Sequence, residues 1–202
     1  MEYFIGRWKG VSETSRKIVQ GVTELGAEFG MHGMTSKMIA KKCGCSEGVI
    51  FKHFNTLDEL KKAVYYDIDG EIYQSIKNID FDEKDVESSV YAIWNKYFEY
   101  LLAHPLKTKY YKNFRSSNLY KSHDHSEDND HYYTIMNVIN SISEKFGLYR
   151  KINYDVLWFF IIDNSLSFAL RISDGSIENT DANKKTIFNI IFAQIINELK
   201  AG

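Results

Sequence analysis

The chain has 202 residues, of which 44% are hydrophobic and 26% charged, the composition of an ordinary globular protein. Two cysteines are too few for a disulfide framework, no N-terminal apolar segment indicates a signal peptide, and no apolar run is long enough to cross a bilayer. We therefore expect a cytoplasmic protein with no membrane association, built as one large domain or as a small domain joined to a larger one.

The formal net charge of −2 is unevenly distributed along the chain. Residues 1–62 carry 10 basic and 7 acidic side chains, whereas the remainder carries 15 basic and 20 acidic ones. A basic N-terminal part on an acidic body indicates a surface for an anionic partner. The asymmetry alone does not identify that partner.

The first predicted helix begins after Ser12, a good N-cap residue. Apolar residues recur at helical spacing from Ile18 to Phe29, and Gly30 and Gly33 end the helix.

Three more helices follow at short intervals. Thr35 or Ser36 caps the second, Gly44 stands at its C-terminal stop, the third spans 46–53 behind a serine N-cap, and the fourth begins near Asp58. Two short helices joined by a glycine-containing turn are typical of a helix-turn-helix, whose later helix enters the major groove of DNA.

Cys43 and Cys45 flank the turn glycine. A metal site would need a further ligand, and only His53 is close in the sequence. We interpret the two cysteines as small apolar residues that pack the helices together.

The rest of the chain also has helical patterns and no strict strand alternation. Helices are expected at 86–103, through Tyr110 and Phe114, and at about 130–147, 154–173 and 182–200. Residues 116–131 are polar and predict a loop. Its histidines and aspartates, from His123 to His131, could bind a metal, but without a fixed scaffold a solvated acidic loop is the preferred interpretation, so no metal or cofactor is expected.

The segment SRKIVQGVTELGAEFGMHGMTSKMIAKKCGCSEGVIFKHFNTLDEL resembles the N-terminal domain of the TetR family of bacterial transcriptional repressors. The matching features are Ile18 and Val22 in the first helix, Gly30 before Thr35, Ile39-Ala40 in the second helix, Gly44 in the turn, Ser46 as a cap, Phe51-x-His53-Phe54 and the later His104-Pro105. The resemblance covers about the first quarter of the chain. It implies an all-α protein with a three-helix helix-turn-helix domain at residues 1–57 and a larger helical effector-binding and dimerisation domain at 58–202.

The resemblance also implies a homodimer that binds palindromic double-stranded operator DNA, one recognition helix per half-site, with half-sites about one helical turn apart. Residues at the positions from which relatives contact DNA are Thr35, Ser36, Lys37, Glu47, Gly48, Val49, Phe51, Lys52 and His53. Lys41 and Lys42 add positive charge, whereas Ile50 and Phe54 are four residues apart and are expected in the core.

Four positions depart from the family pattern. Leu57 stands where a phosphate-contacting lysine is common, Gly26 where a phenylalanine is frequent, and Phe51 where relatives have tyrosine. Glu47 adds a negative charge that would repel phosphates, although its carboxylate can accept a hydrogen bond from a cytosine amine.

Relatives hold a small ligand among their C-terminal helices, and the ligand releases DNA. An apolar or aromatic effector would suit the candidate lining residues here, which are Tyr91, Trp94, Asn95, Phe98, Tyr110, Phe114, Tyr133, Met136 and Asn137. The alternative is that these aromatic stripes are plain core.

The last two predicted helices indicate a dimer interface. The helix at 182–200 is apolar on two sides and therefore needs two partners, its own core and the twin subunit, in a four-helix bundle. Asp163 and Asn164 interrupt the preceding apolar run, and pairing across the dimer is preferred over ligand contact. The candidate interface residues are Trp158, Asp163, Ile187, Ile191 and Ile195.

Two alternatives remain. An enzyme is disfavoured because the chain has no nucleophile elbow, phosphate loop or metal-protease motif. A helix-turn-helix protein without a small-molecule effector is the closer rival, and a ligand-dependent change in DNA affinity would separate it from a ligand-responsive repressor.

Overall fold

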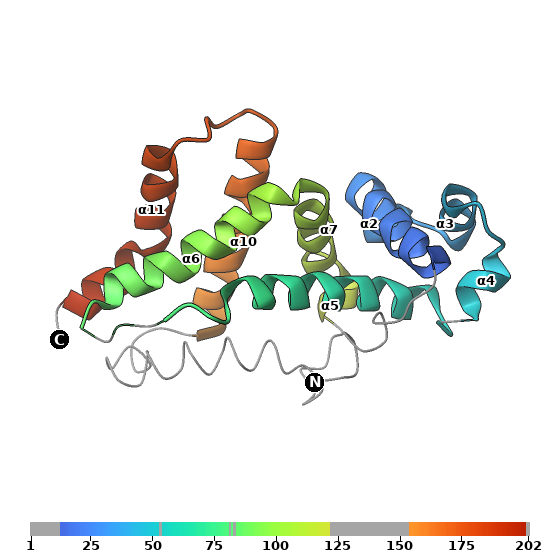
Figure 1. Ribbon diagram of the computed structural model, residues 1–202, viewed down its shortest axis with the longest axis horizontal. Helices are drawn as coiled ribbons and strands as arrows, with labels where there is room; N and C mark the ends of the chain where they lie inside the picture. The colour runs from blue at the N-terminus through green and yellow to red at the C-terminus, as the bar shows by residue number, and fades with distance from the viewer. Residues whose placement is uncertain (1–12, 53, 81, 83, 122–153, 201–202) are drawn as a thin grey trace. The chain divides into compact units, whose positions relative to one another are not determined.

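The first described helix, α2 (Glu13–Gly33), begins one residue after the predicted cap. The computed structural model describes residues 13–52, 54–80, 82, 84–121 and 154–200 (Figure 1). Every regular element among them is an α-helix, which confirms the all-α prediction. None of these helices has the length and hydropathy needed to cross a membrane.

The chain divides into two compact units, each made from two segments. Unit 1 comprises Met1–Glu71 and Leu106–Asp128, and unit 2 comprises Ile72–Pro105 and Asn129–Gly202. This division follows packing, whereas the predicted boundary at residue 57 separates functions and stays a prediction.

Most helices of unit 1 begin close to the predicted residues. They are α2, α3 (Ser36–Cys43), α4 (Glu47–Phe51), the greater part of α5 (Leu57–Ile76), α7 (Pro105–Arg115) and α8 (Asn118–Lys121). Helix α2 packs against α3, and α3 packs against α4. The buried apolar side chains Ile18, Val22, Ile39, Ile50 and Leu60 form part of the core that holds them together.

Local sequence explains the turn between α3 and α4. Thr35 is the N-cap of α3, and its hydroxyl oxygen accepts a hydrogen bond from the backbone N–H of Met38 at 3.3 Å. Gly44 has φ 66°, in the left-handed region, and its N–H bonds the carbonyl of Ala40. Cys43 Sγ donates to the carbonyl of Lys17 at 3.2 Å, so this cysteine joins α3 to α2 rather than to α4.

Helix α7 is fixed to α2 and α5 by polar contacts of one half-buried and one buried side chain. The Tyr110 hydroxyl donates to the carbonyl of Lys61 at 2.8 Å, and Asn113 Nδ2 donates to the carbonyl of Gly26 at 2.9 Å. The Tyr110 side chain is fully buried, and its burial holds the pKa of its hydroxyl well above the ordinary value. Helix α7 therefore contacts α2, the helix against which α3 of the helix-turn-helix packs.

Unit 2 contains α6 (Val86–Ala103), α10 (Tyr154–Ser173) and α11 (Asp181–Lys200), and each of these helices packs against the other two. Buried Trp94 on α6 donates its indole N–H to Ser165 Oγ on α10 at 2.9 Å. Lys184 on α11 forms an ion pair with Glu99 on α6 at 2.7 Å. One polar contact thus fixes α6 against each of its neighbours.

Two expectations about local structure need correction. Residues 116–131 were predicted as a loop, but α8 lies within them, because Leu119 and Tyr120 are buried and Arg115 donates to the Tyr120 hydroxyl at 2.9 Å. Helix α4 has only five residues and is shorter than the predicted 46–53. The predicted helix at 130–147 and the polar cluster at 123–131 lie outside the described residues.

Candidate nucleic-acid interface

The predicted DNA-contacting side chains lie on the surface of α3 and α4. Thr35, Lys37, Glu47, Gly48, Phe51 and Lys52 are exposed, and Ser36 and Val49 are half-buried. Ile50 and Phe54 are buried, as predicted for the core side of the same segment. His53 lies outside the described residues. Helix α4 therefore has one side in the core, whereas Glu47, Gly48 and Phe51 are exposed.

A hydrogen bond joins the starts of the two helices. Ser36 Oγ, in the first turn of α3, donates to Glu47 Oε2, in the first turn of α4, at 2.5 Å. The bond fixes the direction of the one carboxylate on the exposed side of α4. The Ser36 hydroxyl, which was predicted to contact phosphate, donates its proton to Glu47 instead. Ser36 therefore positions the Glu47 carboxylate.

The lysines divide into two groups. Lys42 Nζ lies 2.6 Å from Glu24 Oε2, and this contact raises the pKa of Lys42 and lowers that of Glu24. Its charge is therefore largely compensated within the protein. Lys37 and Lys52 are exposed and make no ion pair within the described part of the chain, so they remain available for phosphates.

The exposed aromatic residue on α4 is Phe51, with 42% of its surface accessible. A phenylalanine at this position has no hydroxyl for phosphate, so its contribution is restricted to apolar or stacking contact. Gly48 meets no protein atom closer than 3.7 Å at the position of an added Cβ, which leaves room for a partner to approach the helix start.

The candidate effector residues are distributed between the two units. Tyr91, Trp94, Asn95 and Phe98 lie in unit 2, Tyr110 and Phe114 lie in unit 1, and Tyr133, Met136 and Asn137 lie outside the described residues. Trp94 stacks on Phe98 with ring centroids 4.6 Å apart. Phe188 and Phe192 on α11 approach Trp94 with ring centroids at 5.4 and 6.4 Å. These rings pack on one another as core residues do.

The predicted dimer residues have different surroundings. Ile187 and Ile191 are 4% and 3% exposed, so both are buried within the single chain. Asp163 is exposed. Trp158 and Ile195 lie within α10 and α11, but the structure does not describe their side chains. The large apolar side chains that are exposed on α10 and α11 are Val156, Phe159, Phe160 and Ile190, and none of them is among the predicted interface residues.

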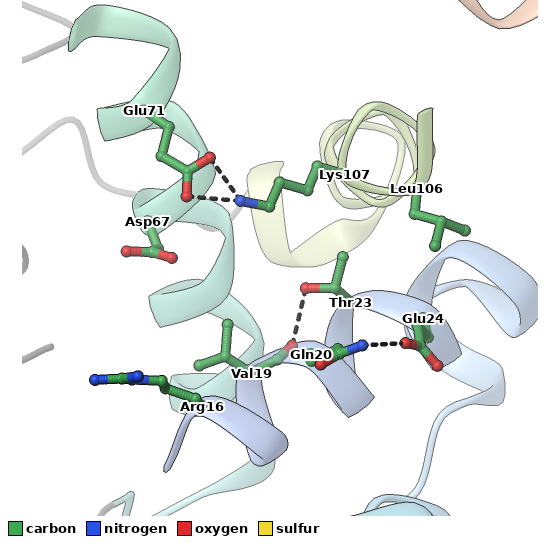
Figure 2. Close-up of a pocket in the computed structure, with 9 residues that line it drawn as sticks. All are labelled: Arg16, Val19, Gln20, Thr23, Glu24, Asp67, Glu71, Leu106 and Lys107. Atoms are coloured by element: carbon green, nitrogen blue, oxygen red, sulfur yellow. Dashed lines mark hydrogen bonds and ion pairs between the residues drawn. The ribbon is translucent and has the colours of Figure 1, made fainter. Parts of the chain in front are cut away.

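A cavity of about 540 Å³ in unit 1 was also not predicted. Figure 2 shows it between α2, α5 and α7, with Asp67 and Glu71 contributed by α5 and Lys107 by α7. The residues that line it are up to 91 positions apart in the sequence, from Arg16 to Lys107. No local sequence pattern predicts a cavity of this kind.

The comparisons with known proteins agree with this geometry. Residues 18–64 match the family described as bacterial regulatory proteins, tetR family. The fold is similar to a TetR family transcription regulator from Marinobacter aquaeolei VT8, with a TM-score of 0.72 and 17% identity over 89% of this chain and 94% of that chain. It is also similar to a putative tetR family transcription regulator from Shewanella sp. PV-4, with a TM-score of 0.68 and 16% identity over 91% of this chain and 98% of that one. A putative transcription regulator from Lactobacillus plantarum has a TM-score of 0.68 and 15% identity over 90% and 97% of the two chains. Residues 18–64 therefore belong to the TetR family, and the chain that carries them has the fold of a TetR-family transcription regulator.

Proposed function

We propose that this protein is a homodimeric transcriptional repressor that binds palindromic double-stranded operator DNA through α3 and α4 and is released by a small apolar or aromatic effector. Such a protein acts in the cytoplasm, where bacterial operators lie, and catalyses no reaction. The observation that carries the proposal is the exposed surface of α3 and α4, whose polar residues face away from a core that contains Ile50 and Phe54.

In the proposed complex, the start of α3 contacts the DNA backbone. The Thr35 oxygen accepts the capping hydrogen bond from Met38, which leaves the hydroxyl proton free to be donated to a phosphate. Lys37 and Lys52 supply positive charge at either side of the turn. Val49, half-buried on α4, packs on a thymine methyl.

Glu47 gives the complex its sequence preference. A carboxylate beside phosphates is unfavourable unless it accepts a hydrogen bond from a base, and the exocyclic amine of cytosine is the suitable donor in the major groove. Ser36 holds the carboxylate in one orientation before DNA arrives, which reduces the ordering cost on binding.

The dimer is supported by the exposed apolar residues of α10 and α11. Val156 and Ile190 are 65% and 59% exposed, and Phe159 and Phe160 are exposed as well. Several exposed large apolar side chains on two helices that pack together indicate an interaction site. We place this surface at the twofold axis, with Asp163 on the same helix, and assign Ile187 and Ile191 to the core beneath it.

The aromatic rings of α6 and α11 are apolar and large, as a site for an aromatic ligand requires. Their close packing equally fits a regulator without a small-molecule effector, in which unit 2 only dimerises. A screen for compounds that release the operator distinguishes the two.

Fluorescence polarisation with a labelled duplex tests DNA binding. The probe is the DNA upstream of the protein's own gene, compared with a scrambled duplex at two salt concentrations. Lys37→Ala and Lys52→Ala are expected to weaken binding and to reduce the salt slope by about 1 each. Lys77→Ala, which removes an exposed lysine outside α3 and α4, is the matched control.

Selective binding that weakens in both variants and not in the control would support the proposal. If the upstream duplex binds no better than the scrambled one, a genomic selection for bound fragments follows. No enriched fragment in that selection would refute DNA recognition.

The oligomeric state tests the dimer separately. Ile190→Asp is expected to convert the dimer to a monomer, measured by light scattering after size exclusion, because a charge would be buried without a partner at the interface. Phe29→Asp makes the same kind of change at an exposed apolar residue in unit 1 and should leave the dimer intact. A monomeric wild-type protein would contradict the proposed assembly.

A further inference from the structure

The cavity in unit 1 has the size of a small-molecule site. Its volume of about 540 Å³ lies within the 300–1,000 Å³ that ligand sites commonly enclose. Figure 2 shows α2, α5 and α7 around it, and all of its lining residues belong to the same compact unit. None of its lining residues belongs to α3, to α4 or to unit 2.

Most of the charged groups that line the cavity are already compensated. Lys107 Nζ donates to both carboxylate oxygens of Glu71 at 2.6 Å. Glu24 accepts from Gln20 Nε2 at 2.9 Å and from Lys42 at 2.6 Å. These groups form the wall of the cavity, and a ligand would have to break existing pairs to use them.

Asp67 differs from these groups. It is half-buried on α5, lines the cavity, and makes no hydrogen bond or ion pair with any residue that the structure describes. Burial, and then the neighbouring charge of Glu71, raise the pKa of its carboxyl group, while Lys107 opposes the shift. A carboxylate that has lost part of its hydration without gaining a partner is a favourable place for a cation.

The cavity also has an apolar side. Val19 on α2 contributes one apolar side chain, and Leu106 on α7, 53% exposed, contributes another. An exposed leucine next to a cavity gains free energy when a ligand covers it, at about 25 cal/mol per Å² of apolar surface removed from water. Arg16 is exposed at the same cavity and stays hydrated, so it needs no anionic ligand.

We propose that this cavity binds a small organic cation, an amine with an apolar body, which places its ammonium group on Asp67 and its hydrocarbon part on Val19 and Leu106. The ligand contacts α2, the helix against which α3 packs. The site is therefore a second candidate point of control over the helix-turn-helix, but its occupancy does not depend on DNA binding and is tested without DNA.

The experiment is a calorimetric titration of the full chain with n-hexylammonium, repeated with n-butylammonium and benzylammonium. Hexanoate and hexanol serve as probes that keep the hydrocarbon part but not the positive charge. We expect saturable binding of the alkylammonium ions, and binding of hexanoate and hexanol at least about tenfold weaker, because one desolvated charge pair accounts for a factor of that order.

Variants locate the site. Asp67→Asn should weaken hexylammonium binding at least about tenfold, whereas Asp80→Asn, which removes the same charge from an exposed residue outside the cavity, should leave it unchanged. Leu106→Ala should weaken binding without altering the preference for the cation. Arg16→Gln should leave hexylammonium binding equal or stronger, since it removes a positive charge from the lining of the cavity.

The results decide the proposal in either direction. No saturable binding of any of the three ammonium probes, or equal binding to wild type and Asp67→Asn, would overturn it. Weaker binding of hexylammonium to Arg16→Gln would also count against it, because removing a like charge from the cavity should not weaken the binding of a cation. Thermal denaturation of each variant without ligand checks that it is folded, so that a loss of binding is assigned to the site.

Discussion

The ring of Tyr110 on α7 occupies the space that a side chain at Gly26 on α2 would need. A Cβ atom added at Gly26 would lie 2.5 Å from both Cδ2 and Cε2 of that ring, and 2.9 Å from Cε of Met31. The TetR pattern often has a phenylalanine at this position of the first helix. Here an aromatic ring comes instead from α7, which tightens the packing that a glycine at position 26 would otherwise leave loose.

We predict that Gly26→Ala destabilises the protein by about 1–3 kcal/mol, because an overpacked core must shift backbone or side chains. Urea denaturation followed by circular dichroism measures the change. Gly48→Ala is the control, since a Cβ there meets nothing closer than 3.7 Å and alanine favours the helix. In a Tyr110→Ala background the cost of Gly26→Ala should fall; an unchanged cost would contradict the role assigned to the ring.

The hydrogen bond between Ser36 and Glu47 leads to a prediction about specificity. Glu47→Gln should raise affinity for scrambled duplex on the order of fivefold, because it removes a negative charge near phosphates. Ser36→Ala should reduce the ratio of the affinity for operator to the affinity for scrambled duplex, since the carboxylate of Glu47 is no longer held in one orientation. Polarisation measurements at fixed salt check both, and a Ser36→Ala protein that discriminates as well as wild type would remove the positioning role.

The helices themselves could be predicted from the sequence because apolar spacing, caps and glycines act locally. Thr35 caps α3 and Gly44 adopts a left-handed conformation for reasons that depend only on neighbouring residues. Ile50 and Phe54 could be assigned to the core because apolar residues four apart share one face of a predicted helix; both are buried, although Phe54 lies beyond the end of α4. Whether the surface around them contacts DNA stays a prediction.

The sequence could not decide which apolar side of α11 faces its own core. Ile187 and Ile190 are chemically identical and three residues apart, yet the first is buried and the second is 59% exposed. That choice depends on how α6 and α10 pack against α11. The cavity around Asp67 has the same origin, because helices that are distant in the sequence enclose it.

The contact between Trp94 and Ser165 gives a third prediction. Ser165→Ala would leave the buried indole N–H without its acceptor, at a cost of about 1–3 kcal/mol. Ser173→Ala, on the same helix but exposed, should change the free energy of unfolding by less than about 0.5 kcal/mol. Equal effects of the two substitutions in chemical denaturation would show that the indole contact contributes little to unit 2.

Asp67 provides a prediction about pH. Its carboxyl pKa is raised in the folded protein, mainly by burial. Between the ordinary aspartate pKa and the raised one, the folded state binds more protons than the unfolded state, so this residue lowers stability as pH rises. Asp67→Asn removes that loss, and the variant should therefore melt at a higher temperature than wild type at pH 7.

The difference between the two proteins should shrink as the pH falls and vanish below the ordinary aspartate pKa of about 4, where both states of the wild-type residue are protonated. Calorimetric melting of both proteins from about pH 3 to pH 7 measures it, with Asp80→Asn as a control for the loss of one negative charge. A difference that stays constant with pH would mean that the substitution acts through packing. Addition of hexylammonium should reverse the order at pH 7, because the bound cation stabilises only the protein that retains the carboxylate.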